Sequence, residues 1–323
     1  MSPTRRHATA GLLAAAAALP VSHAAAQVLV ETPDQEEPPA GIDTGRDRYE
    51  HMLAPVSING QGPFQFLMDT GANTSCVSRA LAERLALTPG PTATVHTVVG
   101  VRARPSVVID HLQVGSRSRK AVKAPSLPFS TEGVDGVLGV DWLKGQRLVL
   151  GFKTRRLEIT ASREDRPEKD QVLVPARRRL GQLTIIDADL SGRRISAMID
   201  SGAQLTMCNA PLRTLVVEAE RRKGAPIPHE RIKLETLAGE PFQGEMLYLP
   251  FVRLGGLHLG NVPVVYADMH VFDIWGLKTT PALMLGMDLL TQFETVSLDF
   301  GRSQVRFDIA GPQGLQALPS KLS

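Results

Sequence analysis

The chain has 323 residues, of which 43% are hydrophobic and 21% are charged, a composition typical of a soluble globular protein with more than one lobe. The net charge of +3 is too small to indicate a nucleic-acid partner. Beyond the N-terminal region no stretch approaches about 18 uninterrupted apolar residues, so we expect no transmembrane segment in the mature chain.

The N-terminus has the pattern of an export signal. Arg5 and Arg6 precede an apolar run at residues 11–19, and the alanines at 24–26 form a cleavage site before Gln27. The apolar run is too short to span a bilayer. We therefore predict a signal peptide at residues 1–26 and an exported protein, periplasmic or secreted, with the general and twin-arginine routes both open.

Prolines and acids dominate residues 27–48, which bury little and therefore predict a flexible lead-in. From Tyr49 the pattern becomes that of strands. Residues 52–58 and 64–68 flank a turn, and this hairpin ends in Asp69, which is followed by Thr70 and Gly71. An aspartate directly after buried apolar residues needs hydrogen bonds to manage its charge, which indicates a chemical role.

The same arrangement returns in the second half of the chain. A hairpin at residues 183–199 ends in Asp200, which is followed by Ser201 and Gly202. A short helix is expected after each acid, from Arg79 to Leu87 with Ser78 as its cap and from Ala210 to Lys223 with Asn209 as its cap. A third copy, Asp43-Thr44-Gly45, has no apolar strand on either side, and we interpret it as solvated linker.

Further landmarks recur in the same order in both halves, which indicates an internal repeat. Turns between extended runs come first, at Thr97-Val98-Val99-Gly100 and at Thr236-Leu237-Ala238-Gly239. Apolar residues followed by glycine come later, at Leu138-Gly139 and at Leu285-Gly286.

Taken together, these stretches resemble the active-site loops and repeats of aspartic peptidases, the pepsin and retropepsin group. The resemblance implies an all-β fold with two β-barrel lobes related by a pseudo-twofold axis, short helices and a central cleft. It divides the chain into an N-terminal lobe at 49–162, an interlobe linker at 163–172, a C-terminal lobe at 173–310 and a tail at 311–323.

The resemblance also implies the chemistry. Asp69 and Asp200 would share one proton and activate a water molecule, because two carboxylates at hydrogen-bond distance cannot both ionise. The hydroxyls of Thr70 and Ser201 would bond across to the opposite loop, and Gly71 and Gly202 would allow close approach of the backbone. The residues that would brace these loops are Leu138, Gly139, Leu285 and Gly286. The candidates for flaps over the substrate are His96, Thr97, Gly100, Thr236 and Gly239, and neither turn has the tyrosine found in pepsin.

We therefore predict an aspartic endopeptidase that acts on a peptide or protein substrate as a monomer, since both acids lie on one chain. We expect no cofactor and no metal, because the eight histidines lack ligand spacing. Cys76 and Cys208 are interpreted as buried structural thiols, and Asp141 and Asp288 as helix caps or buried acceptors. The missing flap tyrosine leaves an alternative open, a non-catalytic two-lobed peptide-binding protein.

Overall fold

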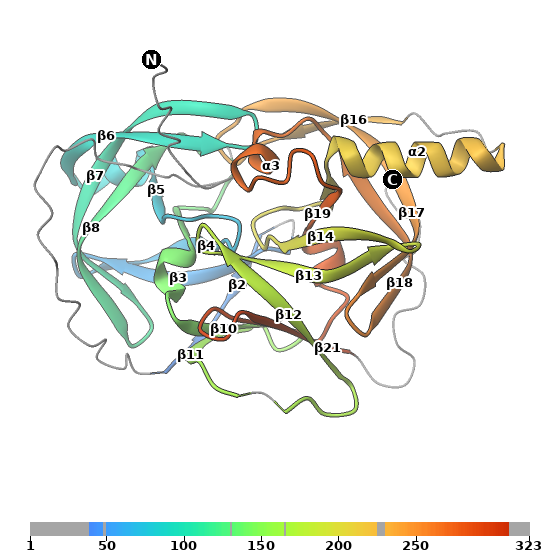
Figure 1. Cartoon of the computed structure of the whole chain (residues 1–323). Helices are drawn as coiled ribbons and strands as arrows, with labels where there is room; N and C mark the ends of the chain where they lie inside the picture. The colour runs from blue at the N-terminus through green and yellow to red at the C-terminus, as the bar shows by residue number, and fades with distance from the viewer. Residues whose placement is uncertain (1–38, 48–49, 130, 165, 225–229, 310–323) are drawn as a thin grey trace, which may run out of the picture.

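The computed structural model describes residues 39–47, 50–129, 131–164, 166–224 and 230–309, and strands dominate this part of the chain. The predicted signal peptide at 1–26 and the predicted tail at 311–323 lie outside the described residues. Two lobes stand side by side in Figure 1, joined below by a sheet and above by hairpins that reach toward each other.

A closed barrel of six strands forms the N-terminal lobe. In order of hydrogen bonding its strands are β3 (Met52–Ile58), β4 (Gln61–Met68), β9 (Gly136–Leu138), β5 (Cys76–Ser78), β8 (Arg117–Leu127) and β7 (Gly100–Val114). The pairing of β3 with β7 closes the barrel. Two more strands extend this sheet, β2 (Gly45–Arg46) beside β3 and β6 (Thr88–Thr97) beside β7. Closure leaves the barrel strands without a free edge.

The C-terminal lobe repeats this barrel strand for strand. Its order is β13 (Gln182–Leu190), β14 (Arg193–Ile199), β19 (Ala282–Leu285), β15 (Met207–Cys208), β18 (Leu257–Tyr266) and β17 (Pro241–Leu254), closed by the pairing of β13 with β17. Strand β16 (Arg231–Glu235) extends the sheet beside β17 as β6 does beside β7. The predicted all-β, two-lobed, pseudo-twofold architecture is confirmed.

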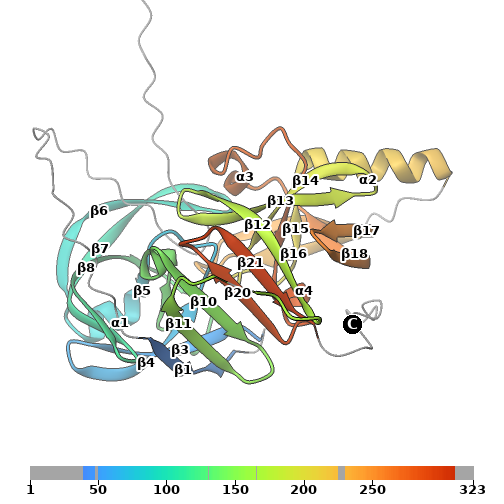
Figure 2. The same ribbon diagram turned by 60° about the horizontal axis from the view of Figure 1, so that its bottom comes forward.

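A third group of strands joins the lobes in a sheet that continues into the C-terminal barrel, while the N-terminal barrel remains a separate sheet. Its order is β1 (Ala40–Asp43), β11 (Arg156–Ala161), β10 (Gln146–Gly151), β20 (Thr295–Asp299), β21 (Gln304–Asp308) and β12 (Gln171–Arg179). The lobes meet where β10 pairs antiparallel with β20, with Val149 opposite Ser297. Figure 2, in which the bottom of Figure 1 comes forward, shows these strands running between the lobes.

The flexible lead-in predicted for residues 27–48 is wrong for residues 40–46, which form β1 and β2. Ala40 and Ile42 alternate inward and are only 2% and 3% exposed, while β1 pairs antiparallel with β11. Asp43 is exposed, as its interpretation as a solvated residue expected, but it ends a strand and does not lie in a linker. Two inward apolar residues are enough to hold this edge strand against the core.

Tight turns and helix caps explain the local structure beside each acid. The β3–β4 and β13–β14 hairpins turn at Asn59-Gly60 and Ser191-Gly192, where all four residues have positive φ, as the tight turns of two-residue hairpins require. Helix α2 (Ala210–Lys223) begins at the cap Asn209 as predicted. Helix α1 (Arg79–Arg84) ends earlier than predicted, because a left-handed Ala86 turns Leu87 into the core.

The remaining helices are short and lie beside the loops. They are the 3-10 helix η1 (Val140–Leu143), α3 (His270–Ile274) and α4 (Met287–Leu290). None of the helices in the described ranges has the length and apolar character needed to cross a membrane.

The burial of β1 generates a stability prediction. Replacing Ile42 with alanine should lower the free energy of unfolding by about 2 to 4 kcal/mol, because a buried side chain is lost and a cavity remains. Asp43→Ala, one residue further along the same strand, should change it by less than about 0.5 kcal/mol because the side chain is exposed. Urea denaturation measures both variants, and equal effects would show that β1 does not belong to the core.

Candidate active site

Asp69 and Asp200 come directly after equivalent strands of the two barrels. Asp69 follows β4, which runs parallel to β9, and its backbone N–H donates to the carbonyl of Leu138 at 3.0 Å. Asp200 follows β14, which runs parallel to β19, and donates in the same way to Leu285 at 3.0 Å. Both acids are 0% exposed. The two barrels therefore present two buried carboxyl groups to each other.

Four hydrogen bonds cross between the two active loops through Thr70 and Ser201. The Thr70 hydroxyl donates to the carbonyl of Ile199 at 2.8 Å and accepts from the backbone N–H of Ser201 at 3.0 Å. The Ser201 hydroxyl donates to the carbonyl of Met68 at 2.7 Å and accepts from the backbone N–H of Thr70 at 3.1 Å. Each hydroxyl is thus used as donor and as acceptor, and the reciprocal pattern holds the loops in one relative position.

Each active-loop glycine lies directly against the opposite carboxyl group. A Cβ on Gly71 would lie 2.5 Å from the Asp200 carboxyl carbon, and one on Gly202 would lie 2.4 Å from that of Asp69. The N–H groups of these glycines donate to the aspartate of their own loop, to Asp69 Oδ1 at 2.8 Å and to Asp200 Oδ1 at 2.9 Å. Only glycine leaves room for this approach.

Burial sets the electrostatics of the pair. It is the main cause that raises the pKa of Asp69 well above its usual range, and the negative charge of Asp200 raises it further. Burial also raises the pKa of Asp200, but the N–H of Gly202, the Asp69 side chain and the nearby His51 oppose that rise. The pair therefore retains one proton more readily than two exposed carboxyls would.

The predicted bracing residues pack under these loops. A Cβ on Gly139 would lie 2.8 Å from the Ala72 carbonyl oxygen, and one on Gly286 would lie 2.5 Å from the Leu205 carbonyl oxygen. The backbone N–H of Gly139 donates to Ser75 Oγ and that of Gly286 to Thr206 Oγ1, both at 3.1 Å. Each strand therefore touches the active loop of its own lobe through backbone atoms.

The same two hydroxyl groups also donate hydrogen bonds to two equivalent acids, Asp141 and Asp288, which follow the bracing glycines in the sequence. Ser75 Oγ donates to Asp141 Oδ1 at 2.9 Å, and Thr206 Oγ1 donates to Asp288 Oδ1 at 2.7 Å. Both acids are hydrogen-bond acceptors beneath the loops, as predicted. Both cysteines are buried thiols, also as predicted, and burial raises the pKa of each thiol.

Comparisons with known proteins agree with this geometry lobe by lobe. A family model described as gag-polyprotein putative aspartyl protease matches residues 54–145, and one described as Aspartyl protease matches residues 186–289. Each matched segment contains one of the two buried acids. The chain belongs to the aspartic peptidase superfamily.

Solved structures show how far the likeness to other members of the superfamily extends. An aspartic proteinase from Irpex lacteus has a TM-score of 0.50 and 14% identity, covering 85% of this chain and 98% of that one, which supports the fold alone. A retropepsin-like aspartic protease from Rickettsia conorii has a TM-score of 0.28 and 20% identity, covering 42% of this chain and 89% of that one. A comparison with curated proteins found no match.

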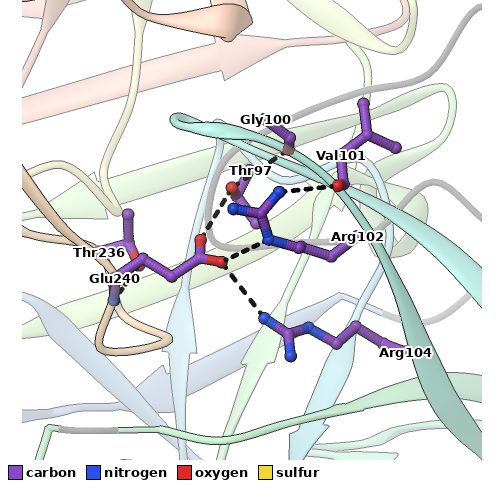
Figure 3. A network of polar contacts seen from close by, with 7 residues as sticks. All are labelled: Thr97, Gly100, Val101, Arg102, Arg104, Thr236 and Glu240. Atoms are coloured by element: carbon purple, nitrogen blue, oxygen red, sulfur yellow. Dashed lines mark hydrogen bonds and ion pairs between the residues drawn. The ribbon is translucent and has the colours of Figure 1, made fainter.

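The flap candidates of this aspartic peptidase-superfamily chain lie at the tips of two hairpins. We call the β6–β7 hairpin, with its tip at residues 97–100, the first flap, and the β16–β17 hairpin, with its tip at residues 236–240, the second flap. Thr97 and Thr236 are buried, and Gly100 and Gly239 have positive φ values. His96 contacts His270 at the start of α3. The structure brings the two tips together across the lobes (Figure 3).

A cavity of about 460 Å³ lies between both flaps and the second active loop. It reaches that loop at Gly202 and Ala203, and Val98 and Thr236 contribute from the flaps. Its other apolar lining residues include Leu67, Val134, Leu205, Met207, Phe242 and Met284. The cavity is therefore suited to an apolar group beside the carboxyl pair.

His51 and Asp47 also line this cavity, and the sequence interpretation missed both. His51 is 7% exposed, and its Nδ1 lies 2.8 Å from Asp47 Oδ2. The internal repeat could have identified His51. Asp69 and Asp200 are equivalent residues 131 positions apart, and the same offset makes residue 51 the equivalent of Gln182. Gln182 donates across the lobes to Asn73 at 2.8 Å, and His51 occupies the pseudo-symmetric position in the N-terminal lobe.

The raised pKa of Asp69 predicts an unusual stability effect. Folded Asp69 retains a proton that the unfolded chain releases above about pH 4, so this group lowers the free energy of unfolding progressively as pH rises. Asp69→Asn removes that penalty while keeping an oxygen for the loop amides. The variant should melt above the wild type at neutral pH, and the difference should shrink toward pH 4. Melting curves from pH 4 to 8 measure this, and a variant less stable throughout would contradict the assignment.

Proposed function

We propose that this protein is an aspartic endopeptidase that hydrolyses peptide bonds with Asp69 and Asp200. The observation that carries the proposal is the pair of buried carboxyl groups, held face to face by the reciprocal bonds of Thr70 and Ser201. Burying two acids together costs stability, which a purely structural role does not explain. Family membership supports the same reaction.

The surroundings of the two acids suggest which of them acts as the general base and which as the general acid. Ionised Asp200 accepts a proton from a water molecule, which attacks the scissile carbonyl carbon. Protonated Asp69, whose pKa is raised by burial and by Asp200, donates its proton to the carbonyl oxygen. Asp200 then returns the proton it took to the leaving amine as the carbon–nitrogen bond breaks, and Asp69 takes back a proton from a hydroxyl of the tetrahedral intermediate as the carboxylic acid product forms. The pair ends with one proton, as it began.

The substrate is proposed to be an extended peptide with an apolar side chain near the scissile bond. An extended segment fits between two β-hairpins, where it can add backbone hydrogen bonds in the manner of a further strand. The cavity beside Gly202 is lined mainly by leucine, methionine, valine and phenylalanine side chains. Its volume of about 460 Å³ accommodates a large apolar side chain.

The working form is proposed to be an exported monomer. Both acids lie on one chain, and the sheet that joins the lobes is completed by β10 and β20 of that same chain. Export rests on the signal pattern at residues 1–26 with cleavage before Gln27. N-terminal sequencing of the mature protein tests the cleavage site.

Activity of acid-to-amide variants tests the catalytic assignment. Asp69→Asn and Asp200→Asn should each reduce kcat by about a thousandfold or more, because an amide can neither hold the shared proton nor act as a base. Asp43→Asn is the matched control, since it changes the third Asp-Thr-Gly copy at an exposed residue and should leave kcat unchanged. Mass spectrometry of a diverse peptide pool measures cleavage.

Two results would contradict the proposal. Substantial turnover by either single variant would exclude the carboxyl pair as the catalytic group. Peptides that bind to the wild type but are never cleaved would favour the non-catalytic peptide-binding alternative.

The raised pKa values predict a mild pH optimum. Activity requires the singly protonated pair, and burial raises the pKa of both acids, so both limbs of the profile should lie above those of exposed carboxyls. We expect an optimum between about pH 4 and 7. Ala72→Ser tests the cause, because a hydroxyl donating to ionised Asp69 lowers the pKa of the proposed acid and should move the alkaline limb to lower pH. A strongly acidic optimum, or an unmoved limb in the variant, would contradict this reasoning.

A further inference from the structure

The two flaps are tied together through the carboxylate of Glu240. Its Oε2 accepts a hydrogen bond from Thr97 Oγ1 at 3.0 Å, and its Oε1 lies 3.2 Å from Arg102 Nε and 3.3 Å from Arg104 Nη2 (Figure 3). Thr97 and both arginines belong to the first flap, while Glu240 belongs to the second. One carboxylate therefore connects the two lobes on the side of the molecule opposite their shared sheet.

The local structure of each flap positions its side chains for this contact. The backbone N–H of Glu240 donates to Thr236 Oγ1 at 3.1 Å, and Gly239 donates to the Thr236 carbonyl at 2.9 Å, so the turn fixes where the carboxylate points. Arg102 and Arg104 are two residues apart on β7, which places them on one face of the strand. The side chain of Glu240 is only 17% exposed, so salt and water weaken these contacts less than on an open surface.

A second contact holds the other edge of the first flap. The backbone N–H of His270, at the start of α3, donates to the Val98 carbonyl at 2.8 Å. The rings of His96 and His270 stack with their centroids 5.4 Å apart. Burial, and then the neighbouring His270, lower the pKa of His96, which favours the uncharged ring in this stack. The first flap therefore rests on the C-terminal lobe at two places.

This closure hides the acids that the proposed reaction needs. Asp69 and Asp200 are 0% exposed, and the cavity reaches the active loop at Gly202 without including either carboxyl among its lining. A peptide can reach the pair only if a flap moves. Of the contacts that hold the first flap, the Glu240 cluster is the one built from charged side chains at the tips.

We propose that Glu240 is a positioning residue that latches the first flap over the catalytic pair, so that opening of this ionic latch admits the peptide and its closing aligns the peptide for reaction. The proposal rests on the proposed peptidase function for its second half. The latch itself concerns only the two flaps and can be tested without substrate.

Hydrogen exchange of the first-flap amides tests the latch directly. Glu240→Gln keeps the size of the side chain but removes its charge, and it should speed exchange at residues 94–104 by about tenfold, the effect of losing one charge-assisted contact. Arg102→Gln with Arg104→Gln should do the same from the other flap. Combining all three should add little more, because they break one interaction.

The chain offers a matched control for charge loss between the lobes. Glu294 pairs with Lys153 at 2.5 Å across the lobes at the joining sheet, and both side chains are about half exposed. Glu294→Gln should leave first-flap exchange unchanged. Unchanged exchange in Glu240→Gln, or equal acceleration in Glu294→Gln, would overturn the latch. Thermal melting of each variant confirms that the fold is retained.

Peptide cleavage tests the second half of the proposal. For the wild type, KM should rise with moderate salt, which weakens the latch, and this salt dependence should be lost in Glu240→Gln, whose KM should already be raised several-fold at low salt. An identical salt dependence in both proteins would overturn the role in peptide entry. If the wild type cleaves nothing while exchange behaves as expected, the peptidase function fails and the flap latch stands.

Discussion

The structure depends on keeping two carboxyl groups together in a site that is shielded from bulk solvent. Such groups repel each other when ionised and lose their hydration, so isolated charges there would be strongly unfavourable. The chain counters this with the N–H groups of Gly71 and Gly202, and with hydroxyls from Thr70 and Ser201 that fix the two loops. The packing beneath the acids, including that of the bracing glycines, allows the two active loops to approach each other this closely.

The two lobes obey the pseudo-twofold symmetry beneath the acids and depart from it at the rim of the site. Beneath the acids, Ser75 with Asp141 and Thr206 with Asp288 form the same contacts in both lobes. At the rim, His51 takes the place of Gln182, and α3 has no counterpart among the described residues of the N-terminal lobe. A pair of equivalent acids requires a symmetric support, whereas a peptide, which has direction, requires an asymmetric surface.

The lobes are joined in two physically different ways. Below, β10 and β20 merge them through backbone hydrogen bonds in a sheet with a buried apolar core. Above, side chains join them: Glu240 with Thr97 and the arginines, and His96 with His270. Backbone pairing within a sheet opens only with unfolding, while side-chain contacts at hairpin tips can break and re-form. We therefore expect motion on the side of the molecule where substrate is proposed to enter.

The sequence by itself determined whatever depends on local pattern and on the repeat. Strand alternation and tight turns located the hairpins that end in Asp69 and Asp200, and side-chain caps located the helix starts. The repeat paired the acids, the flap turns and the bracing glycines, and so identified two lobes. These features follow from spacing within short windows, where backbone geometry restricts which residues can follow one another.

Only the tertiary structure decided which distant residues meet. The sequence analysis missed strand β1, because this short segment after several prolines becomes a strand only by pairing with the edge of β11, which is distant in the sequence. The contact of Glu240 with Thr97 joins residues 143 positions apart. No local rule selects such a pair, because it forms only after both barrels have closed and the joining sheet has set the distance between their hairpins.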